Sequence, residues 1–487
     1  MKTTVLQKVK GVLQSPFTVQ TFDVNDTFRW LKVEFEKSAK GWSELLLFDP
    51  NGVVRAQALV LSEKGELIIS DQEITSSFST VSGPIQTGRW RLEIFSQKEI
   101  EFHCRLELGM DDLVHAHPFE IDIFTTSNEK PSFELAGWNP ELKVQTESKW
   151  YKGDFHTHTN LSDGKLTVDE GMASARNMGL DFFVATDHNI LPTKWMKSDI
   201  LVIPGIEITS SKGHFNAHGI RKWVDWRPSC EDGGMETEKG MNRILKEVKQ
   251  AGGVRSINHP QLKPWEWQFK ETLLKEIDVI EIWNDPTFKD NPKATEEALV
   301  LWDTLLNDGY RIAGIGGSDS HMRPTDLYPG ATVPSLIGDP ATYVWAEGLS
   351  GSSILEGIKR GHVYVTRFID LKVDVKSNDS LILLGSEVEG DVVVDYTLKM
   401  EKTTEECEVI WIQNGEVIQK DLILPNSPYN FRASFEDSEF QWIRFELRRK
   451  DGELLAFSNP IYKGCKTPTL TTWGELLAKS GVEVIED

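Results

Sequence analysis

The strongest constraint on the fold lies between residues 149 and 368, where apolar runs of strand length alternate with amphipathic stretches of helical period. Alternating β and α segments predict an α/β arrangement with parallel strands. Nearly every predicted strand in this region ends on a histidine, an aspartate or a glutamate. Because the carboxyl ends of such strands meet at one edge, we expect these side chains to gather there.

The first strand end is DFHTHTNLSDG, residues 154–164. Two histidines separated by one residue point to the same side of an extended strand, so His156 and His158 can reach one ion. Asp163 follows in the adjoining loop. An isolated HxH before a Ser-Asp-Gly turn is equally typical of an ordinary polar strand, and the later strands must decide between the two interpretations.

The later predicted strands supply further ligand types at their ends: Asp187, His188, Glu207, His218, His259, Glu281, Asn284, Asp319 and His321. Of the eleven histidines in the chain, those at strand ends are more than scattered placement would produce: His156, His158, His188, His218, His259 and His321. We expect the others to be non-ligands: His103, His115, His117, His214 and His362. A mixed histidine and carboxylate set without thiolates favours Zn, Mn or Fe.

The length of 487 residues exceeds what one hydrophobic core usually supports. Period-2 alternation before and after the α/β region, as in RWLKVEFEK and LKVDVKS, predicts flanking β-sandwiches. The Asn414-Gly415 pair marks a hairpin in the second of them. We therefore predict four parts: an N-terminal β-sandwich over 1–148, a metal-dependent barrel over 149–368, a C-terminal β-sandwich over 369–466 and a short helical tail over 467–487.

Composition excludes several functional classes. No apolar run is long enough to span a bilayer, and the first residues lack a signal-peptide pattern, so we expect a cytoplasmic protein. A formal charge of −22 without a basic run disfavours long nucleic acid, whereas a small anionic substrate at bound metals remains compatible. The cysteines are too widely spaced for a disulfide framework or a thiolate zinc site: Cys104, Cys230, Cys407 and Cys465.

The motifs HTH…SDG, TDH, the glutamate of PGIE, NHP and GSDSH together resemble the polymerase and histidinol phosphatase (PHP) metallohydrolases. PGIEIT, INHP, IEIWN and GGSDSH are most similar to the carbaryl-hydrolase and microcin-processing-like branch. The resemblance covers about residues 150–366. It implies a distorted (β/α)7 barrel with two or three divalent ions, Zn, Mn or Fe, at the carboxyl ends of the strands.

The resemblance also implies a division of the ligands among the ions. His156 and His158 would hold the first ion with Asp319, and Glu207 would bridge it to the second. His259 and His218 would complete the second site, with His214 as the alternative to His218. A third ion would take Asp163, His188 and His321. Glu281 remains open as a ligand, an outer carboxylate or a strand-end charge, and Asp187 is expected to orient neighbouring ligands.

These residues favour a metal-dependent hydrolase, most readily a phosphoesterase that cleaves a small phosphomonoester or phosphodiester with a hydroxide on the metals. Asp319 would act in catalysis as well as in binding, Arg255, Lys165 or Arg323 would contact phosphate, and Asn284 would donate to the leaving oxygen or cap its loop. The alternatives are hydrolysis of a carboxyl ester, carbamate or amide, and a non-catalytic metal-containing binding module.

The β-sandwiches would cover the barrel, mediate oligomerisation or recognise a partner. Tryptophans in the loops beside the cleft would stack on a base or sugar or pack as a lid: Trp223, Trp226, Trp265 and Trp267.

Overall fold

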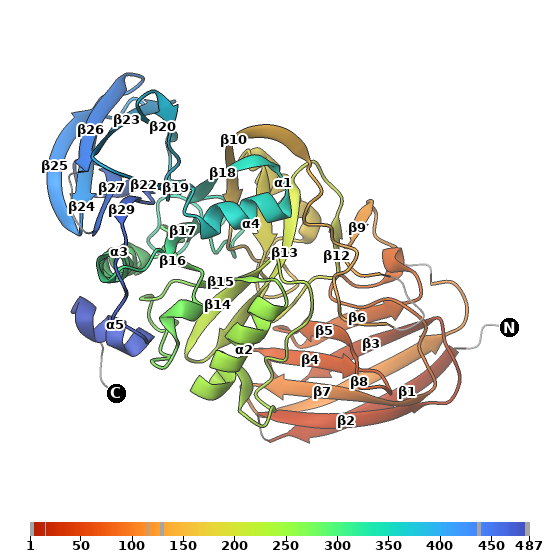
Figure 1. The fold of residues 1–487 in the computed structure, drawn as a ribbon. Helices are drawn as coiled ribbons and strands as arrows, with labels where there is room; N and C mark the ends of the chain where they lie inside the picture. The colour runs from red at the N-terminus through yellow and green to blue at the C-terminus, as the bar shows by residue number, and fades with distance from the viewer. Residues whose placement is uncertain (1–3, 15, 114–115, 127–130, 436–439, 483–487) are drawn as a thin grey trace.

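The computed structural model describes residues 4–14, 16–113, 116–126, 131–435 and 440–482. The fold is mixed α/β, with strands predominating. N-terminal strands, a central α/β region and C-terminal strands follow one another along an elongated molecule (Figure 1). His115, expected to be a non-ligand, lies outside the described residues.

The N-terminal strands form two antiparallel four-stranded sheets with the orders β1-β8-β3-β6 and β2-β7-β4-β5. Their bounds are β1 (Thr4–Leu13), β2 (Phe17–Val24), β3 (Trp30–Lys37), β4 (Ser43–Phe48), β5 (Val54–Leu59), β6 (Lys64–Ser70), β7 (Gly88–Ser96) and β8 (Ile100–Gly109). Burial alternates along β8, and Leu106 and Trp90 are buried in the core shared by these sheets. Alternate residues of a strand face opposite sides, so the sequence alternation produces this two-layer packing. A short strand, β9 (Ile121–Ile123), and a 3₁₀ turn (Glu73–Thr75) complete the part.

The central region alternates strands with helices. Its strands are β10 (Gln145–Asp154), β11 (Phe182–Ala185), β12 (Lys194–Met196), β13 (Leu201–Ser210), β14 (Gly213–His218), β15 (Val254–Ile257), β16 (Val279–Asn284), β17 (Ala313–Gly317), β18 (Ala341–Leu349) and β19 (Val363–Thr366). Its helices are α1 (Val168–Asn177), α2 (Glu238–Gln250), α3 (Asn291–Asp308) and α4 (Gly351–Lys359), with 3₁₀ turns at Gly234–Glu236 and Leu274–Glu276. Thr167 and Glu170 form a capping box that begins α1.

The barrel expected from the resemblance is not confirmed, because the sheet does not close. β10, β11 and β13 are parallel neighbours, as are β15, β16 and β17, whereas β14 is antiparallel to both β13 and β15. The edge of β10 that would pair with β17 in a closed barrel pairs with β18 instead. In the described structure, β10 and β17 are linked by a single bridge beyond their ends, between Thr157 and Ser320. The sheet continues instead through β18 and β19.

The C-terminal strands pack as two layers, one of which extends the central sheet. Their bounds are β20 (Asp370–Ser377), β21 (Ser380–Leu381), β22 (Glu387–Val388), β23 (Val392–Glu401), β24 (Cys407–Gln413), β25 (Glu416–Ile423), β26 (Pro428–Phe435), β27 (Phe440–Arg448), β28 (Leu454–Ser458) and β29 (Ile461–Gly464). β28 pairs with β19, which makes one continuous sheet, and β21-β20-β23-β26 form the other layer. The helix α5 (Trp473–Ser480) follows and contacts α3.

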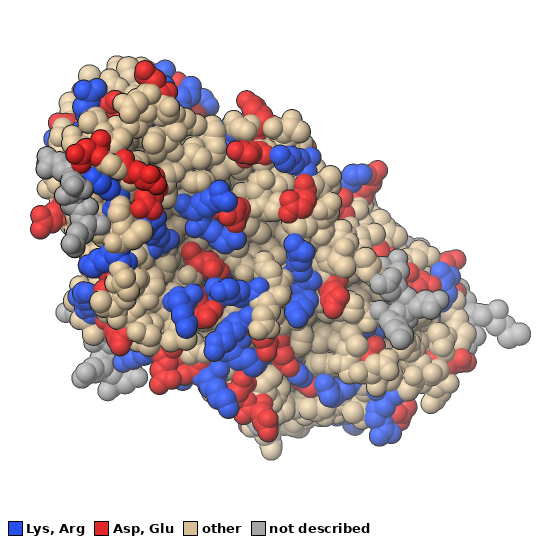
Figure 2. Space-filling model, in the orientation of Figure 1, with Lys and Arg blue, Asp and Glu red and all other residues tan. Residues whose placement is uncertain are grey.

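None of the helices in the described part of the chain combines the length and apolar character that crossing a bilayer requires. Charged side chains of both signs are interspersed over the face of the molecule shown in Figure 2.

Candidate metal centre

The polar residues at the strand ends come together at one edge of the central sheet. His156 and His158 follow β10, His188 follows β11, His259 follows β15, and Asp319 and His321 follow β17. Glu207 lies within β13, near its carboxyl end. Because most of these strands run parallel, their carboxyl ends carry all of these side chains to the same place.

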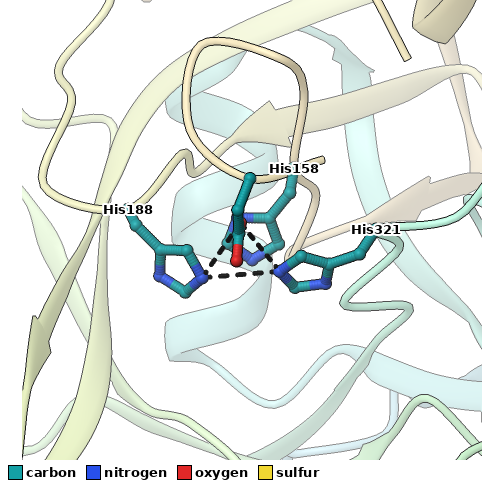
Figure 3. A group of neighbouring side chains, drawn as sticks. His158, His188 and His321 are labelled. Carbon is teal, nitrogen blue, oxygen red and sulfur yellow. Dashed lines mark hydrogen bonds and ion pairs between the residues drawn. The ribbon is translucent and has the colours of Figure 1, made fainter. Parts of the chain in front are cut away.

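One group consists of His158, Asp163, His188 and His321, whose potential ligand atoms all lie within 4.8 Å of one another. The rings of His158, His188 and His321 point toward one another (Figure 3). Asp163 Oδ1 lies 3.1 Å from His321 Nε2 and 3.4 Å from His188 Nε2. The loop after β10 and the ends of β11 and β17 thus supply one ring of donors.

A second group joins His156 and His158 to Asp319, whose Oδ1 lies 3.3 Å and 3.0 Å from their Nε2 atoms. His158 is shared with the first group, so the two groups adjoin. Asp319 adopts a left-handed φ of 47°, which is uncommon outside glycine and is frequent at functional sites.

Glu207 connects two further groups, one with His156 and His259 and one with His188 and His214. Its Oε1 lies 3.2 Å from His156 Nε2 and 3.2 Å from His214 Nδ1, and its Oε2 lies 2.6 Å from His188 Nδ1. This carboxylate is fully buried. A carboxylate shared between two donor groups has the arrangement of a bridging ligand.

Within the described part of the chain, many of these buried atoms find no hydrogen-bond partner: His156 Nε2, His158 Nε2, Asp163 Oδ1, Glu207 Oε2, His214 Nδ1, His259 Nδ1 and Asp319 Oδ1. Buried polar atoms are normally satisfied, so a cluster of exceptions that converge on common points requires a cause. Cations between the rings and carboxylates would satisfy them together. The donor set therefore fits divalent metal ions.

Protonation differs among the residues of the cluster. Although burial acts in the opposite direction, neighbouring carboxylates raise the pKa of His156 and His188, and they raise the pKa of His321 to about 10, so a bound ion would displace protons from these rings. Burial, together with His321 and His188, lowers the pKa of His158 to about 3. Although burial acts in the opposite direction, His156 and His188 hold the pKa of the Glu207 carboxyl well below its usual range. Neutral imidazole and ionised carboxylate are the forms that coordinate metals.

Other polar side chains orient these donors from outside. Glu281 accepts hydrogen bonds from His156 Nδ1 at 3.0 Å and from the backbone N–H of His259 at 2.8 Å. The Asn284 amide donates to Glu281 at 3.1 Å and to Asp319 Oδ2 at 3.3 Å. The Glu281 carboxylate thus has the contacts of an outer carboxylate, the second of the three roles that the sequence left open.

Asp187 also lies outside the donor groups, and it holds the loop that follows β10. It accepts hydrogen bonds from the Thr159 backbone at 2.8 Å and from the Ser162 hydroxyl at 2.7 Å. Both donors precede Asp163, so Asp187 fixes the path of the loop that presents this ligand.

His218 does not lie in any of the four donor groups, and His214 occupies the position expected for it. β14 runs antiparallel to β13, with Thr209 opposite His214 and Gly205 opposite His218. The start of β14, and not its end, therefore lies beside the carboxyl end of β13. His218 is buried against Phe155, with ring centroids 5.4 Å apart.

A sequence signal for this reversal exists. Ser211 and Lys212 form a two-residue connection between β13 and β14, and Gly213 follows with a φ of 123°. Two strands joined by so short a loop form an antiparallel hairpin. Recognition of this turn would have directed the prediction to His214.

Arg255 does not contribute to the cluster. Its guanidinium is buried and pairs with Asp278 at 2.8 Å and with Glu276 at 2.5 Å. Arg255 pairs in register with Ala217, next to His218, so it lies toward the end of β14 remote from His214. The prediction that it contacts phosphate conflicts with this location, and the two nearby carboxylates explain why it is held there.

The two other candidate cations also lie outside the cavity described below. Lys165 pairs with Asp326 at 3.0 Å, and Arg323 is exposed. His117, an expected non-ligand, lies 2.9 Å from the Ser76 carbonyl oxygen through Nε2 and packs on Phe78.

The cluster opens into a cavity of about 980 Å³. Its floor includes Asp163, His188, His214, Asp319 and His321. Its sides include residues of the N-terminal strands, which the sequence reasoning did not place at the site: Trp42, Glu44, Phe95 and Ser96. No short-range pattern links these residues to the cluster.

No family model matches the chain, and no curated protein matches it. Among solved structures, a two-domain protein from Bacteroides vulgatus, described as containing a predicted PHP-like metal-dependent phosphoesterase, is similar over 66% of this chain and 97% of its own, at 18% identity and a TM-score of 0.35.

Two smaller proteins are also similar to parts of the chain. A candidate metal-dependent phosphoesterase from Bifidobacterium adolescentis is 15% identical over 38% of this chain and 91% of its own, with a TM-score of 0.24. An amidohydrolase from Chromobacterium violaceum is 15% identical over 36% of this chain and 92% of its own, with a TM-score of 0.22. The interpretation of the site therefore rests on the geometry of this chain.

Proposed function

We propose that the protein is a metal-dependent hydrolase of the PHP type, and that it acts as a phosphoesterase on a small phosphomonoester or phosphodiester. The observation that carries this proposal is the set of four overlapping donor groups, which share His156, His158, His188 and Glu207. Shared donors bring neighbouring ion sites close together, as hydrolysis assisted by several metals requires.

We assign His156, His158 and Asp319 to one ion, with Glu207 as the bridge to an ion that His259 helps to hold. We assign to His214, which lies beside Glu207, the role that the sequence predicted for His218. Asp163, His188 and His321 form the third site. Bound divalent ions would activate water and neutralise charge on the phosphoryl oxygens. Glu281 and Asn284 keep the His156 ring and the Asp319 carboxylate oriented. The ions are proposed as Zn, Mn or Fe.

The third donor group favours phosphoester over acyl chemistry, because an additional ion can neutralise charge on the phosphoryl oxygens. One observation favours the rival hydrolysis of a carboxyl ester, carbamate or amide. The residues lining the cavity, among those that the structure describes, include aromatic side chains but no lysine or arginine. A shared hydroxide would serve either reaction, so the two proposals differ in the substrate that the cavity admits.

Metal analysis combined with three chromogenic esters tests the proposal. We expect two or more ions per chain and turnover of p-nitrophenyl phosphate or bis(p-nitrophenyl) phosphate, with little turnover of p-nitrophenyl acetate. Turnover of the acetate alone would support the acyl hydrolase instead. A chain without metal or turnover would correspond to the non-catalytic binding module.

The His158→Ala variant tests the site directly. His158 belongs to two donor groups, so its loss should remove metal and activity together. His103→Ala, in β8 of the N-terminal sandwich, is the matched control and should retain both. Full activity in His158→Ala would overturn the ligand assignment.

A cytoplasmic location, oligomerisation through the β-sandwiches and a small anionic substrate remain part of the proposal. The four cysteines are free, in agreement with a reducing compartment.

A further inference from the structure

The cavity above the metal centre is larger than a phosphate group needs. Its volume of about 980 Å³ is at the upper end of the range for small-molecule sites, roughly 300–1,000 Å³. The space beyond the donor cluster must therefore accommodate another part of the substrate.

Aromatic side chains from two parts of the chain line this space. Trp42 directly precedes β4, Phe95 lies in β7, and Trp265 and Phe288 come from loops of the central region. We call these four residues the aromatic wall. Buried contacts join the N-terminal strands to the central region, because the Glu93 carboxylate of β7 lies 2.8 Å from Arg227 and the Glu44 carboxylate of β4 accepts from Asn189 at 2.7 Å.

The aromatic wall is held in place and partly uncovered. The Trp42 indole N–H donates to Glu44 at 2.8 Å, and its ring lies 5.3 Å from that of His188. Trp265 packs edge-on against Phe288, with centroids 6.0 Å apart, yet remains 41% exposed. The oriented Trp42 indole beside His188 and the partly exposed Trp265 indole each offer a surface for a flat apolar group.

Apart from its histidines, the charged side chains that line the cavity, among the described residues, are carboxylates. Among the described residues that line the cavity there is no lysine or arginine, while Glu44, Glu236 and Asp285 add carboxylates beyond those of the donor groups. A phosphomonoester is largely a dianion near neutral pH, and sites for dianions commonly use arginine or lysine. A phosphodiester has one negative charge, which the metal centre can match without such side chains.

We infer that the substrate is a phosphodiester with a single negative charge, one of whose ester groups has a flat apolar or aromatic ring that packs on the aromatic wall. This inference rests on the proposed phosphoesterase function. In the reaction the oxygen of water bonds to phosphorus, the P–O bond to one alcohol breaks, the departing oxygen takes one proton of the water, and the other proton passes to the solvent near neutral pH. The product is a doubly charged monoester, which the acidic lining does not favour, so it is released without a second cleavage.

Paired substrates on the metal-loaded enzyme test the charge preference. We expect kcat/KM for bis(p-nitrophenyl) phosphate to exceed that for p-nitrophenyl phosphate by at least about tenfold, after correction for the intrinsic reactivity of the two esters. The reason is that one poorly matched charge at the site weakens binding by about tenfold. Phosphorus NMR should show p-nitrophenyl phosphate accumulating without inorganic phosphate. Equal or better turnover of the monoester would overturn the inference while leaving the proposed phosphoesterase intact.

An added cation tests the same preference by a gain of function. Gln97 is exposed at the cavity and belongs to no donor group. Gln97→Lys should raise kcat/KM for the monoester and so narrow the diester-to-monoester ratio severalfold, whereas the neutral Gln97→Met should leave the ratio unchanged. An unchanged ratio in both variants would contradict the electrostatic part of the inference.

The aromatic wall is tested by Trp42→Ala and Trp265→Ala. Loss of ring packing should raise KM for bis(p-nitrophenyl) phosphate about tenfold with metal content retained. Trp345→Ala is the matched control, because Trp345 packs on Trp150 and does not line the cavity. An unchanged KM in both Trp42→Ala and Trp265→Ala would overturn the proposed packing of the substrate's ring on the aromatic wall. Hydrolysis of p-nitrophenyl acetate alone would instead overturn the underlying phosphoesterase proposal.

Discussion

At the scale of single residues, His214 and His218 have similar sequence surroundings and different environments. Both are buried on β14, four residues apart. His214 lies 3.2 Å from Glu207, whereas the described part of the chain provides no hydrogen-bond partner for either ring nitrogen of His218. Burial, together with the neighbouring His156, lowers the pKa of His218 to about 3, so this ring is neutral.

The variants His214→Gln and His218→Gln form a matched pair on one strand. We expect His214→Gln to weaken metal binding by roughly 100-fold or more, since removal even of a group that supports a ligand typically costs 10–100-fold. His218→Gln should retain the metal content of the wild type. Metal per chain, measured after equilibration with a buffered free-metal concentration, distinguishes them, and the reverse pattern would restore the original assignment.

Lys37 is a buried cation away from the metal centre. Its ammonium donates to the Val60 carbonyl at 2.6 Å and to the Ser43 hydroxyl at 2.9 Å. Burial lowers the pKa of Lys37 to about 8, whereas an unfolded lysine has a pKa of about 10.4. Between these values the unfolded chain binds more protons than the folded chain, so this residue makes stability rise with pH.

We therefore expect the free energy of unfolding of the wild type, relative to Lys37→Met, to increase between pH 8 and pH 10.5. Below pH 8 the difference should be constant, because both states then hold the proton. Urea unfolding of the two proteins at matched pH values measures it. A difference that decreases over this range would show that burial does not lower the pKa of Lys37.

At the scale of elements, a buried ion-pair network fastens α3 to the C-terminal strands. The Arg444 guanidinium on β27 binds the Asp303 carboxylate through two contacts of 2.9 Å and Glu446 at 2.6 Å. The Arg444 side chain is 1% exposed. Burial raises the pKa of Asp303 although Arg444 opposes the change, so the carboxylate depends on this partner.

Arg444→Met should destabilise the protein by about 3–5 kcal/mol, because it leaves the buried Asp303 carboxylate without its cation, whereas Glu446 keeps its contact with Arg448 at 2.6 Å. Arg432→Met is the control: its pair with Asp395 is 2.7 Å long but largely exposed, and such pairs contribute about 0–1 kcal/mol. Denaturant unfolding of both variants tests the contrast. Similar decreases in the free energy of unfolding of the two variants would show that burial does not strengthen the contribution of the Arg444 network to stability.

At the scale of the whole molecule, the N-terminal sandwich supports the loop that presents His188. Asn189 has a left-handed φ of 54°, and its side-chain amide donates to Glu44 of β4 at 2.7 Å and accepts from the Thr209 backbone N–H at 3.0 Å. The Lys194 ammonium, fully buried, pairs with Glu73 at 2.8 Å. The structure thus connects a metal ligand with a distant part of the chain through buried polar contacts.

Metal binding should therefore stabilise the assembled molecule. An ion present at about 100 times its Kd contributes about 2.7 kcal/mol. Because the unfolding entropy is about 2.1 cal/mol/K per residue, this free energy would raise the unfolding midpoint of a 487-residue chain by roughly 3 °C. We expect chelation to lower the midpoint of the wild type by this amount in calorimetry and to leave His158→Ala unchanged. An equal response of the two proteins would show that the stabilising ion binds elsewhere.

Patterns short enough to read locally predicted much of this protein. The capping box at Thr167 begins α1, and Asn414-Gly415 turns β24 into β25 with positive φ at both residues, as local backbone chemistry requires. The alternation of the flanking segments yields two-layer sheets. Most strand-end donors gather because each follows its strand directly, and parallel strands present the same edge.

Only the tertiary structure decided the features that depend on partners distant in the chain. The pairing of β10 with β18 leaves the central sheet open, and the antiparallel direction of β14 selects His214 over His218. Arg255 is drawn to Asp278 and Glu276, and Trp42 reaches the cavity more than a hundred residues before the first ligand in the chain. The sequence by itself thus determined which residue types follow each strand, because the order of strand and loop depends on residues that are adjacent in the chain. The tertiary structure determined which strand edges, charges and rings meet, because pairing and burial join segments far apart.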